Sequence, residues 1–303
     1  MSALPGRTAA ILVVYRPRLP IDGLLQRLVG CVGLVVLVDN AERPDARWPA
    51  LAQRLGFDLI AARNVGAIAG AYNRALELLE RQYPDRFDQV VLLDDDSDPS
   101  VLGAFLSDAA VAVRLTDPGT AAVAPAYRDR ATGLRGRHIV LERWRLRYLA
   151  REFDGMHQVA FVINSMSTWR RDALRRIGAF NEDLALDHVD TEYGLRARQL
   201  GLSLWVHGDH EFAHAIGERR AFRFLGREMQ AGGHAPARRR LIARNTMRLA
   251  RDWAWREPAF AFLCLTRLAY EAVGILMVED QKAAKLLALA IGAGAGLLGR
   301  RHR

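Results

Sequence analysis

A run of three aspartates, Asp94-Asp95-Asp96, is the first group of side chains whose types and spacing could carry chemistry. Two carboxylates one residue apart at the end of an apolar stretch can hold a hard divalent cation such as Mg²⁺ or Mn²⁺. A cation in that place binds and polarises a diphosphate. The alternative for a run of this kind is a solvated turn, in which Asp98 caps a helix that begins at Pro99.

A second acidic group, formed by Asp187, Asp190 and Glu192, surrounds the start of an expected helix. The helix dipole stabilises carboxylates at a helix N-terminus, so a capping role is one interpretation of these residues. A carboxylate can also act as a general base, which contributes on the order of 10²–10⁴-fold to a reaction rate. The residues alone leave both roles open.

The segment His210-Glu211-Phe212-Ala213-His214 is a literal H-E-x-x-H sequence, which on a helix would bind zinc for hydrolysis. A third histidine ligand is missing, because Arg220 stands where one would be needed. The segment also follows a strand through Gly208, a poor start for a zinc-binding helix. A zinc metallohydrolase is therefore the minor alternative. We expect His214 alone to contact a metal or diphosphate, and His207 and His210 to be ordinary surface or turn residues.

Short apolar runs and amphipathic stretches alternate through the first two thirds of the chain. This pattern predicts an α/β domain with a largely parallel sheet, in which ligands bind at the carboxyl ends of the strands. The expected strands are Ala9–Tyr15, Val32–Val38, Phe57–Ala62, Gln89–Leu93, Ala121–Tyr127, Val159–Ile163 and Leu202–Val206. The expected helices are Leu24–Val29, Ala67–Arg81, Asp172–Ile177 and Asp190–Leu200. Arg128–Arg151, rich in arginine and interrupted by glycine, is expected to be a mobile loop.

The charge of the 303-residue chain is unevenly distributed. The formal net charge is +9, and residues 218–303 alone hold 17 Lys and Arg against 7 Asp and Glu. We therefore expect a near-neutral catalytic domain over residues 1–217 and a basic helical region over residues 218–303. The expected helices of that region are Ala221–Gln230, Ala237–Arg256, Pro258–Val278 and Gln281–Leu298.

Composition excludes several classes of protein. Half of the residues are hydrophobic and a quarter are charged, which is ordinary for a globular protein and not for a disordered one. The two cysteines, Cys31 and Cys264, cannot form a disulfide framework and are expected to be packing residues. The N-terminal residues lack a long apolar core, so we expect no signal peptide. No G-x-G-x-x-G follows the first strand, so a dinucleotide oxidoreductase finds no support.

Taken in order, the motifs of residues 8–217 resemble those of family 2 glycosyltransferases with the GT-A fold, above all the bacterial rhamnosyltransferases. Val13-Val14-Tyr15-Arg16-Pro17 resembles the end of the family's first strand, and Val38-Asp39-Asn40 its second-strand VDN. The other matching motifs are Asn64-Val65-Gly66 with Asn73, Leu93-Asp94-Asp95-Asp96-Ser97, Asn164-Ser165-Met166-Ser167, Asp187 through Arg196, and His214 through Gly217. Met166 departs from the pattern, because the family has glycine there.

The resemblance implies a role for each matched residue. It implies donor-nucleotide contacts for Tyr15, Asp39, Asn64, Gly66, Asn73, Asp94 and Asp95. Asp96 and His214 would hold a divalent metal, Mg²⁺ or Mn²⁺, and Asp190 would be the general base of an inverting transfer. Ser165, Asp187 and Glu192 would lie on the acceptor side. Turn-forming roles stay open for Asp39, Asn64 and Gly66.

The basic region carries an Arg-rich stretch with tryptophans, Ala237–Arg256, which is typical of a membrane-surface helix. A solvated face packed on the catalytic domain is the alternative, and no base-reading motif supports nucleic acid. Pro258–Val278 is apolar but contains Arg267 and Glu271, so we expect a peripheral protein at the cytoplasmic face of the plasma membrane. The expected partners are a nucleotide-sugar donor, most simply dTDP-L-rhamnose, and a saccharide or polyprenyl-diphosphate-linked acceptor. Galactofuranose or N-acetylhexosamine donors are alternatives, and the sequence leaves a homo-oligomer open.

Overall fold

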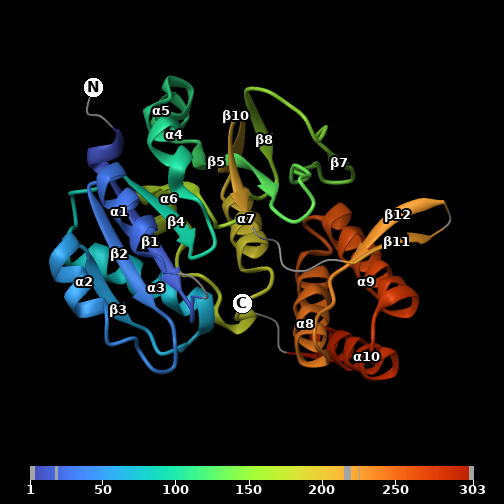
Figure 1. The fold of residues 1–303 in the computed structure, drawn as a ribbon. Helices are drawn as coiled ribbons and strands as arrows, with labels where there is room; N and C mark the ends of the chain where they lie inside the picture. Colours follow the sequence, from blue (N-terminus) through green and yellow to red (C-terminus); the bar gives the residue numbers. More distant parts are fainter. Residues whose placement is uncertain (1–3, 18–19, 215–219, 225, 300–303) are drawn as a thin grey trace. The chain divides into compact units, whose positions relative to one another are not determined.

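Apolar runs that are buried on both faces form the centre of a mixed eight-stranded sheet (Figure 1). The computed structural model describes residues 4–17, 20–214, 220–224 and 226–299. The chain divides into two compact units, residues 1–138 with 149–215, and residues 139–148 with 216–303. The sheet lies in the first unit. Its strands, from one edge to the other, are β3 (Asp58–Ala61), β2 (Leu34–Asp39), β1 (Thr8–Val14), β4 (Gln89–Asp94), β9 (Ser167–Arg170), β5 (Thr120–Asp129), β10 (Ser203–His214) and β8 (Met156–Val159).

Helices cover both faces of this sheet. Every second residue of β1, from Ala10 to Val14, belongs to one apolar cluster that also holds side chains of α1, α2, α4 and α5. The residues between them, such as Ile11, are equally buried and face the other side, where α3 packs on β1 and β2. The helices of this unit are α1 (Asp22–Cys31), α2 (Trp48–Leu55), α3 (Ala67–Gln82), α4 (Leu102–Ser107), α5 (Ala109–Thr116), α6 (Arg171–Ile177) and α7 (Val189–Gln199), with 3₁₀ turns η1 (Leu4–Arg7), η2 (Pro99–Val101) and η3 (Glu182–Leu184).

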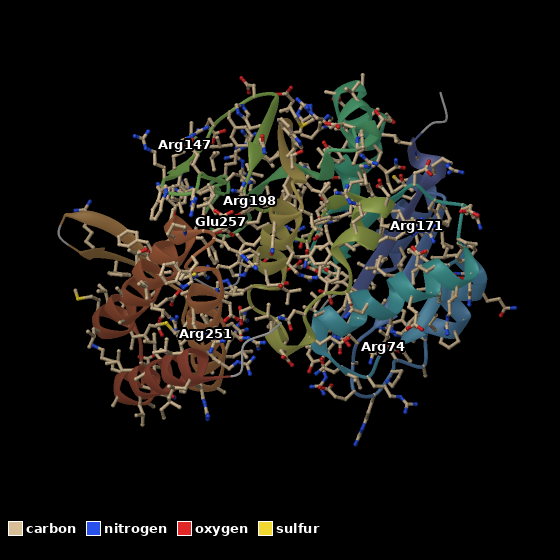
Figure 2. The ribbon with its side chains drawn as sticks, turned by 180° about the vertical axis from the view of Figure 1, so that it is seen from behind. Arg74, Arg147, Arg171, Arg198, Arg251 and Glu257 are labelled. Carbon is tan, nitrogen blue, oxygen red and sulfur yellow. The ribbon has the colours of Figure 1, made fainter. Side chains whose placement is uncertain are left out.

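Side chains fix the ends of several helices. Asp98 accepts a hydrogen bond from the backbone N–H of Ser100, which confirms its predicted capping role. Arg171 is buried beside the C-terminus of α3, where its guanidinium donates to the carbonyl oxygens of Leu79 at 2.8 Å and Tyr83 at 2.5 Å (Figure 2). Backbone carbonyls at a helix C-terminus lack partners within the helix, and a cation satisfies them there.

The described residues of the second unit form three helices and two hairpins. Gly292 and Gly296 let α10 approach α8 closely, since a Cβ at either position would lie 2.2 Å from a carbonyl oxygen of Arg240 or Arg244. The buried guanidinium of Arg239 pairs with Glu271 and Glu279. The elements are β6 (Ile139–Leu141), β7 (Leu146–Tyr148), β11 (Arg220–Phe224), β12 (Arg227–Ala231), α8 (Pro236–Trp253), α9 (Pro258–Val278) and α10 (Lys282–Leu298).

Several sequence predictions are corrected by the structure. The helix predicted over Ala221–Gln230 is wrong: the segment is the hairpin β11–β12, where Gly226 has a φ of 75° in the turn. Exposure alternates along β11, with Phe222 buried between exposed neighbours, which is the period of a strand. Arg128–Arg151 is not a loop throughout, because it contains the end of β5 and the hairpin β6–β7. The predicted strand Val159–Ile163 is misplaced: the strand observed there, β8, covers Met156–Val159 and ends at the residue where the predicted one begins.

The arginine-rich helix α8 is the central helix of its unit and not a surface helix. It packs against both α9 and α10, and its Trp253 is buried, so this tryptophan cannot anchor the protein in a membrane. Trp255, beyond the helix end, is 85% exposed. The large exposed apolar side chains of this unit lie instead mainly on α9 and α10: Phe262, Leu265, Tyr270, Leu276, Met277, Leu287, Ile291, Leu297 and Leu298.

Candidate functional site

The predicted site residues of several strands meet at one edge of the sheet. β1, β2, β3 and β4 are parallel, so Tyr15, Asp39 and Asp94 lie at their carboxyl ends together. β9 is antiparallel to β4 and β5, which brings its beginning, near Ser165, to the same edge. β10 runs parallel to β5 and delivers His214 there. Ligands of open α/β sheets bind at this edge.

Asp94 is held rigidly by two hydroxyl groups. The Tyr72 hydroxyl donates to Oδ1 of Asp94 at 2.9 Å, and the Ser165 hydroxyl donates to Oδ2 at 2.6 Å. Tyr72 and Ser165 are both buried, so these bonds do not compete with bulk water. Asp94 therefore anchors the acidic run to the sheet and to α3.

Tyr72 connects the acidic run to α7, the helix that carries Asp190. Burial raises the pKa of Tyr72 well above its usual value, and the charges of Asp94, Asp190 and Asp96 raise it further. Phe180, 5.3 Å from Tyr72 between ring centres, stacks on Tyr193 of α7 at 3.8 Å. This aromatic packing fixes α7, whose first turn contains Asp190, near the acidic run.

Asp96 and His214 form a pair with unused ligand atoms. Oδ1 of Asp96 lies 3.5 Å from Nδ1 of His214, and neither buried atom has a hydrogen-bond partner among the described residues. Burial raises the pKa of Asp96, and the charge of Asp94 adds to this effect, although His214 and Arg130 oppose it. A carboxylate oxygen and an imidazole nitrogen at this separation suit a divalent cation, which would relieve the excess negative charge.

Asp95 faces the end of β1. Its Oδ2 accepts a hydrogen bond from the backbone N–H of Tyr15 at 3.2 Å. Burial raises the pKa of Asp95 to about 6, and the charges of Asp96 and Asp94 contribute. The folded protein therefore favours the protonated form of this carboxyl group more than the unfolded chain does.

This shift predicts a pH-dependent gain in stability for Asp95→Asn. The wild type loses stability as the pH rises from the unfolded pKa near 3.8 through the folded pKa of about 6, while asparagine cannot ionise. Above pH 6, without metal or nucleotide, we expect a higher Tm for Asp95→Asn than for wild type, with the two values converging near pH 4. Thermal denaturation from pH 4 to 8 measures this difference. A constant difference at every pH would contradict the assignment.

Tyr15 and Asn64 belong to one hydrogen-bonded cluster around Glu42. The Tyr15 hydroxyl donates to Oε1 of Glu42 at 2.9 Å, and the amide of Asn64 donates to the same oxygen at 3.1 Å. Arg16 donates to Oε2 at 2.8 Å. The cluster joins the segments that follow β1, β2 and β3. Tyr15 is 45% exposed, so it can also contact a ligand.

Asp39, Gly66 and Asn73 shape the surrounding loops. The two carboxylate oxygens of buried Asp39 accept from the backbone N–H groups of Ala41 and Asp45. Gly66 has a φ of 73°, and a Cβ there would lie 2.2 Å from the Glu182 carboxylate. The Asn73 side chain exchanges hydrogen bonds with the backbone of Phe180 and also donates to Glu182. Nucleotide contacts by Asp39, Gly66 and Asn73 stay predictions.

The residues predicted for the acceptor side lie in different surroundings. Ser165 is buried under Asp94, as described above. Asp187 lies in the turn before α7, where the neighbouring His188 has a φ of 70°. Glu192 is buried and pairs with Arg196, one turn further along α7, at 2.9 Å. This pair makes Glu192 a structural residue of α7, while its acceptor role stays a prediction.

The zinc-hydrolase alternative is wrong. His210 and His214 lie on strand β10, where residues four apart are about 13 Å apart along the chain and cannot share an ion as on a helix. Burial raises the pKa of Glu211, but hydrogen bonds from Arg128 and Arg135 outweigh it and hold this pKa below its usual value. Glu211 is therefore a paired carboxylate and not the base of such an enzyme.

Four residues of the site escaped sequence analysis. Tyr72 has the helical spacing of a core residue, and nothing in the sequence reveals its bond to Asp94. Glu42 lies in a loop and Glu182 begins the 3₁₀ turn η3, neither of them in a motif, and only the fold brings them to Asn64 and Asn73. Arg130, whose charge lowers the pKa of Asp96, lies in an arginine-rich segment with no distinguishing spacing.

Comparison with solved structures identifies the fold. The chain is similar to GalNAc-T7, solved with UDP, GalNAc and Mn²⁺, at a TM-score of 0.50 and 11% identity, over 83% of this chain and 49% of that chain. Glucosyl-3-phosphoglycerate synthase from Mycobacterium tuberculosis, in complex with Mn²⁺, UDP and phosphoglyceric acid, aligns at a TM-score of 0.30 and 19% identity, over 43% and 46%. The chain thus spans about half the length of these proteins. No protein-family model and no curated protein sequence matches it.

The fold is that of the GT-A glycosyltransferases, which confirms the fold class predicted from the sequence. In this chain the antiparallel strand β9 lies between β4 and β5. The acidic run stands at the end of β4. The narrower resemblance to rhamnosyltransferases stays a prediction.

Proposed function

We propose that this protein is a metal-dependent glycosyltransferase that transfers a sugar from a nucleotide-sugar donor to a saccharide acceptor. The observation that carries the proposal is the pair of unpartnered ligand atoms on Asp96 and His214, at the carboxyl edge of a GT-A sheet. GalNAc-T7, which shares this fold, was solved with UDP and Mn²⁺, and this supports a nucleotide diphosphate and a divalent metal here.

Asp96 and His214 are the residues that would hold Mg²⁺ or Mn²⁺. The bound cation would neutralise the donor diphosphate and stabilise it as the leaving group. Asp94 keeps the acidic run in place through Tyr72 and Ser165. Tyr15 and Asn64, ordered by Glu42, would contact the nucleotide, together with Asp39, Gly66, Asn73 and Asp95.

Asp190 is the proposed general base. Its Oδ1 accepts from the backbone N–H of Thr191 at 2.7 Å, which orients the carboxylate at the start of α7. The carboxylate would take the proton from the acceptor hydroxyl as that oxygen attacks the anomeric carbon. A single direct attack of this kind inverts the anomeric configuration. Asp187 would lie beside the acceptor.

The proposed donor is dTDP-L-rhamnose, on the strength of the motif order from Tyr15 to His214, and the acceptor is a saccharide or a polyprenyl-diphosphate-linked glycan. UDP-galactofuranose and UDP-N-acetylhexosamines are the alternative donors. A thermal-shift panel of these nucleotide sugars with Mg²⁺ or Mn²⁺ tests the proposal, because a ligand that binds the native state raises its Tm. We expect a metal-dependent shift with dTDP-L-rhamnose. No shift with any dTDP or UDP ligand would contradict the proposed function.

We further propose that the second unit attaches the enzyme to the cytoplasmic face of the plasma membrane. Among the described residues, α9 is the one single helix that is long and apolar enough to cross a bilayer, by length and composition only. Only 22% of its most apolar window is buried inside the protein, so most of this apolar surface is exposed. Glu271, near the middle of α9, pairs with buried Arg239 of α8, so one side of α9 stays bound to a polar partner. An interfacial position for α9 and α10 fits both facts.

Exposed apolar residues of α9 and α10 should therefore control vesicle binding. We expect Phe262→Glu and Leu287→Glu each to weaken partition into anionic vesicles by about tenfold or more, since burying such a side chain is worth roughly 1.5–3 kcal/mol. Vesicle flotation measures this effect. Val113→Glu, at an equally exposed apolar position of the first unit, is the matched control. Unchanged flotation of both α9 and α10 variants would contradict the membrane proposal.

A further inference from the structure

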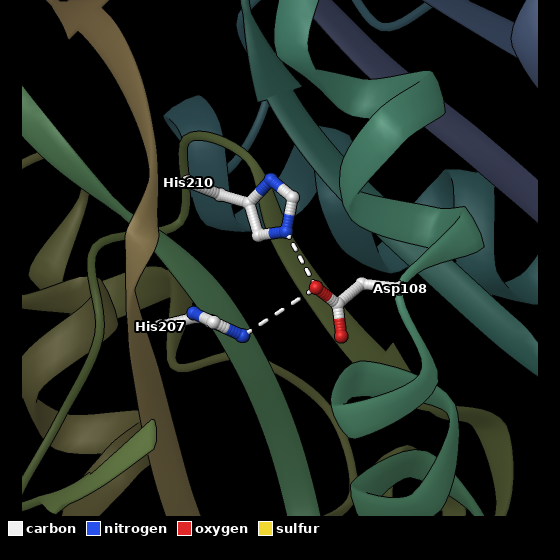
Figure 3. A group of neighbouring side chains, drawn as sticks. All are labelled: Asp108, His207 and His210. Carbon is white, nitrogen blue, oxygen red and sulfur yellow. Dashed lines mark hydrogen bonds and ion pairs between the residues drawn. The ribbon is translucent and has the colours of Figure 1, made fainter. Parts of the chain in front are cut away.

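Three side chains outside the proposed donor site converge on one point of the first unit (Figure 3). Asp108 lies between α4 and α5, and His207 and His210 lie on β10. Oδ2 of Asp108 is 2.9 Å from Nε2 of His210 and 3.6 Å from Nε2 of His207. One ligand atom from each of the three residues lies within 4.8 Å of the other two. Among the described residues, no other group of three His, Cys, Asp or Glu side chains meets this condition.

A bulge in β10 brings both histidines to Asp108. His207 pairs with Pro125 of β5, but the next paired residue is Glu211, opposite Ala126. Residues 208–210 are therefore extra, and they let two side chains three positions apart reach the same neighbour, which a regular strand forbids.

The bulge is firmly held. Gly208 packs so closely that a Cβ would lie 2.1 Å from the carbonyl oxygen of Phe153. Its own carbonyl oxygen accepts from Arg135 at 2.7 Å, and its N–H donates to Gly155 at 2.7 Å. The two imidazoles are thus presented by a rigid part of the strand.

We propose that Asp108, His207 and His210 bind one divalent transition-metal ion, of which Zn²⁺ suits the ligands best. Two imidazoles and a carboxylate are a zinc donor set, and zinc bonds of about 2.0–2.2 Å place tetrahedral ligand atoms roughly 3.3 Å apart. The two measured separations from Asp108 lie on either side of that value. Three protein ligands leave the fourth position for water.

The two carboxylate oxygens of Asp108 have different contacts. Its Oδ1 caps α5 by accepting from the backbone N–H groups of Ala110 and Val111, while Oδ2 faces the two histidines. Without an ion, one oxygen would serve two imidazoles, and the 3.6 Å separation from His207 is too long for a hydrogen bond. A cation between the three groups satisfies all of them at once.

Asp209 would support His207 as an outer partner. The backbone N–H of Asp209 donates to Nδ1 of His207 at 3.2 Å, so Nε2 carries the proton when no ion is bound. In the metal-bound state Nδ1 would carry the proton and lose the bond from the Asp209 N–H, and the Asp209 carboxylate, whose Oδ2 lies 3.9 Å from Nδ1, would become the acceptor. Carboxylates commonly orient metal-binding histidines in this way.

The site would fasten the N-terminus of α5 to β10, the strand that ends at His214. Because the ion binds the folded state, it would raise the stability of the first unit. It differs from the H-E-x-x-H arrangement, since it uses only one residue of that motif and draws its other ligands from His207 and Asp108.

Zinc binding to the full chain carrying Asp96→Asn tests this proposal, because that substitution disables the proposed donor-site metal. Zn²⁺ is titrated against a chromogenic chelator, and bound metal is counted after dialysis. We expect about one equivalent of Zn²⁺, a higher Tm with zinc, and visible absorption by a Co²⁺-loaded sample typical of tetrahedral coordination.

Two further substitutions locate the ion. His210→Gln and Asp108→Ser should each weaken zinc binding by more than the roughly 10–100-fold that loss of an outer partner costs. Serine still caps α5, so Asp108→Ser tests the ligand without removing the cap. His157→Gln, a histidine of the same unit outside the group, is the control and should keep the site. Absence of stoichiometric zinc would overturn the proposal. So would zinc affinities of His210→Gln and Asp108→Ser that equal the affinity of the chain with an intact group.

Discussion

Asp96→Asn will remove the metal-dependent binding of the nucleotide donor while leaving the fold intact. The substitution keeps the size of the side chain but removes the charge from an oxygen that lies 3.5 Å from His214. Loss of a charged ligand should lower the affinity for donor with Mn²⁺ by at least about 100-fold, more than loss of an outer partner would cost. Isothermal titration of the nucleotide sugar, with and without Mn²⁺, measures this directly and needs no acceptor.

A neighbouring aspartate provides the control for Asp96→Asn. Asp98→Asn removes the same charge two residues away, but asparagine still caps η2 by accepting from Ser100. We expect Asp98→Asn to bind the donor as the wild type does. Equal Mn²⁺-dependent affinities for Asp96→Asn and wild type would show that Asp96 is no metal ligand and would remove the main support for the proposed function.

The central strands could be predicted from the sequence because their burial leaves no ambiguity. All seven residues of β1 are buried, so the run is apolar without alternation and indicates a strand covered on both faces. The acidic run and His214 were found because they follow apolar runs or match a motif in order. Their convergence then follows from strand direction alone.

Features that depend on residues distant in the sequence could not be predicted. Arg239 is buried in the centre of the second unit only because Glu271 and Glu279 neutralise it from elsewhere in the chain. An arginine-rich helix with no visible partners indicates a surface, and this is why α8 was expected to face a membrane. The bulge at Gly208 is equally invisible in sequence, and without it His207 and His210 would face opposite sides of β10.

The helix prediction for the segment that forms the short hairpin β11–β12 was wrong for a different reason. Five residues per strand are too few to separate a period of 2 from one of 3.6, and the alternation around Phe222 is clear only once burial is known. The predicted domain boundary at residues 217 and 218, and the motif residues from Ala215 to Gly217, lie outside the described residues.

Asp190→Asn will slow the chemical step and leave donor binding unchanged. Asparagine retains the oxygen that accepts from Thr191 but cannot take a proton, so the side chain stays in place without acting as a base. The expected loss is on the order of 10²–10⁴-fold in kcat. Slow transfer of the sugar to water, followed as release of nucleoside diphosphate from saturating donor, measures kcat without knowledge of the acceptor.

The matched comparison for Asp190→Asn lies two residues along the same helix. Glu192→Gln breaks the ion pair between buried Glu192 and half-buried Arg196, whose guanidinium also donates to the carbonyl oxygens of Ile177 and Ala179. Loss of the carboxylate leaves the guanidinium of Arg196 without its charge partner. We therefore expect this variant to have a lower Tm but a kcat close to the wild-type value. Asp190→Asn should show the opposite pattern, with wild-type Tm and donor affinity but a collapsed kcat. If Asp190→Asn kept its rate, or lost it only in proportion to its Tm, the base would have to be sought elsewhere in the first unit.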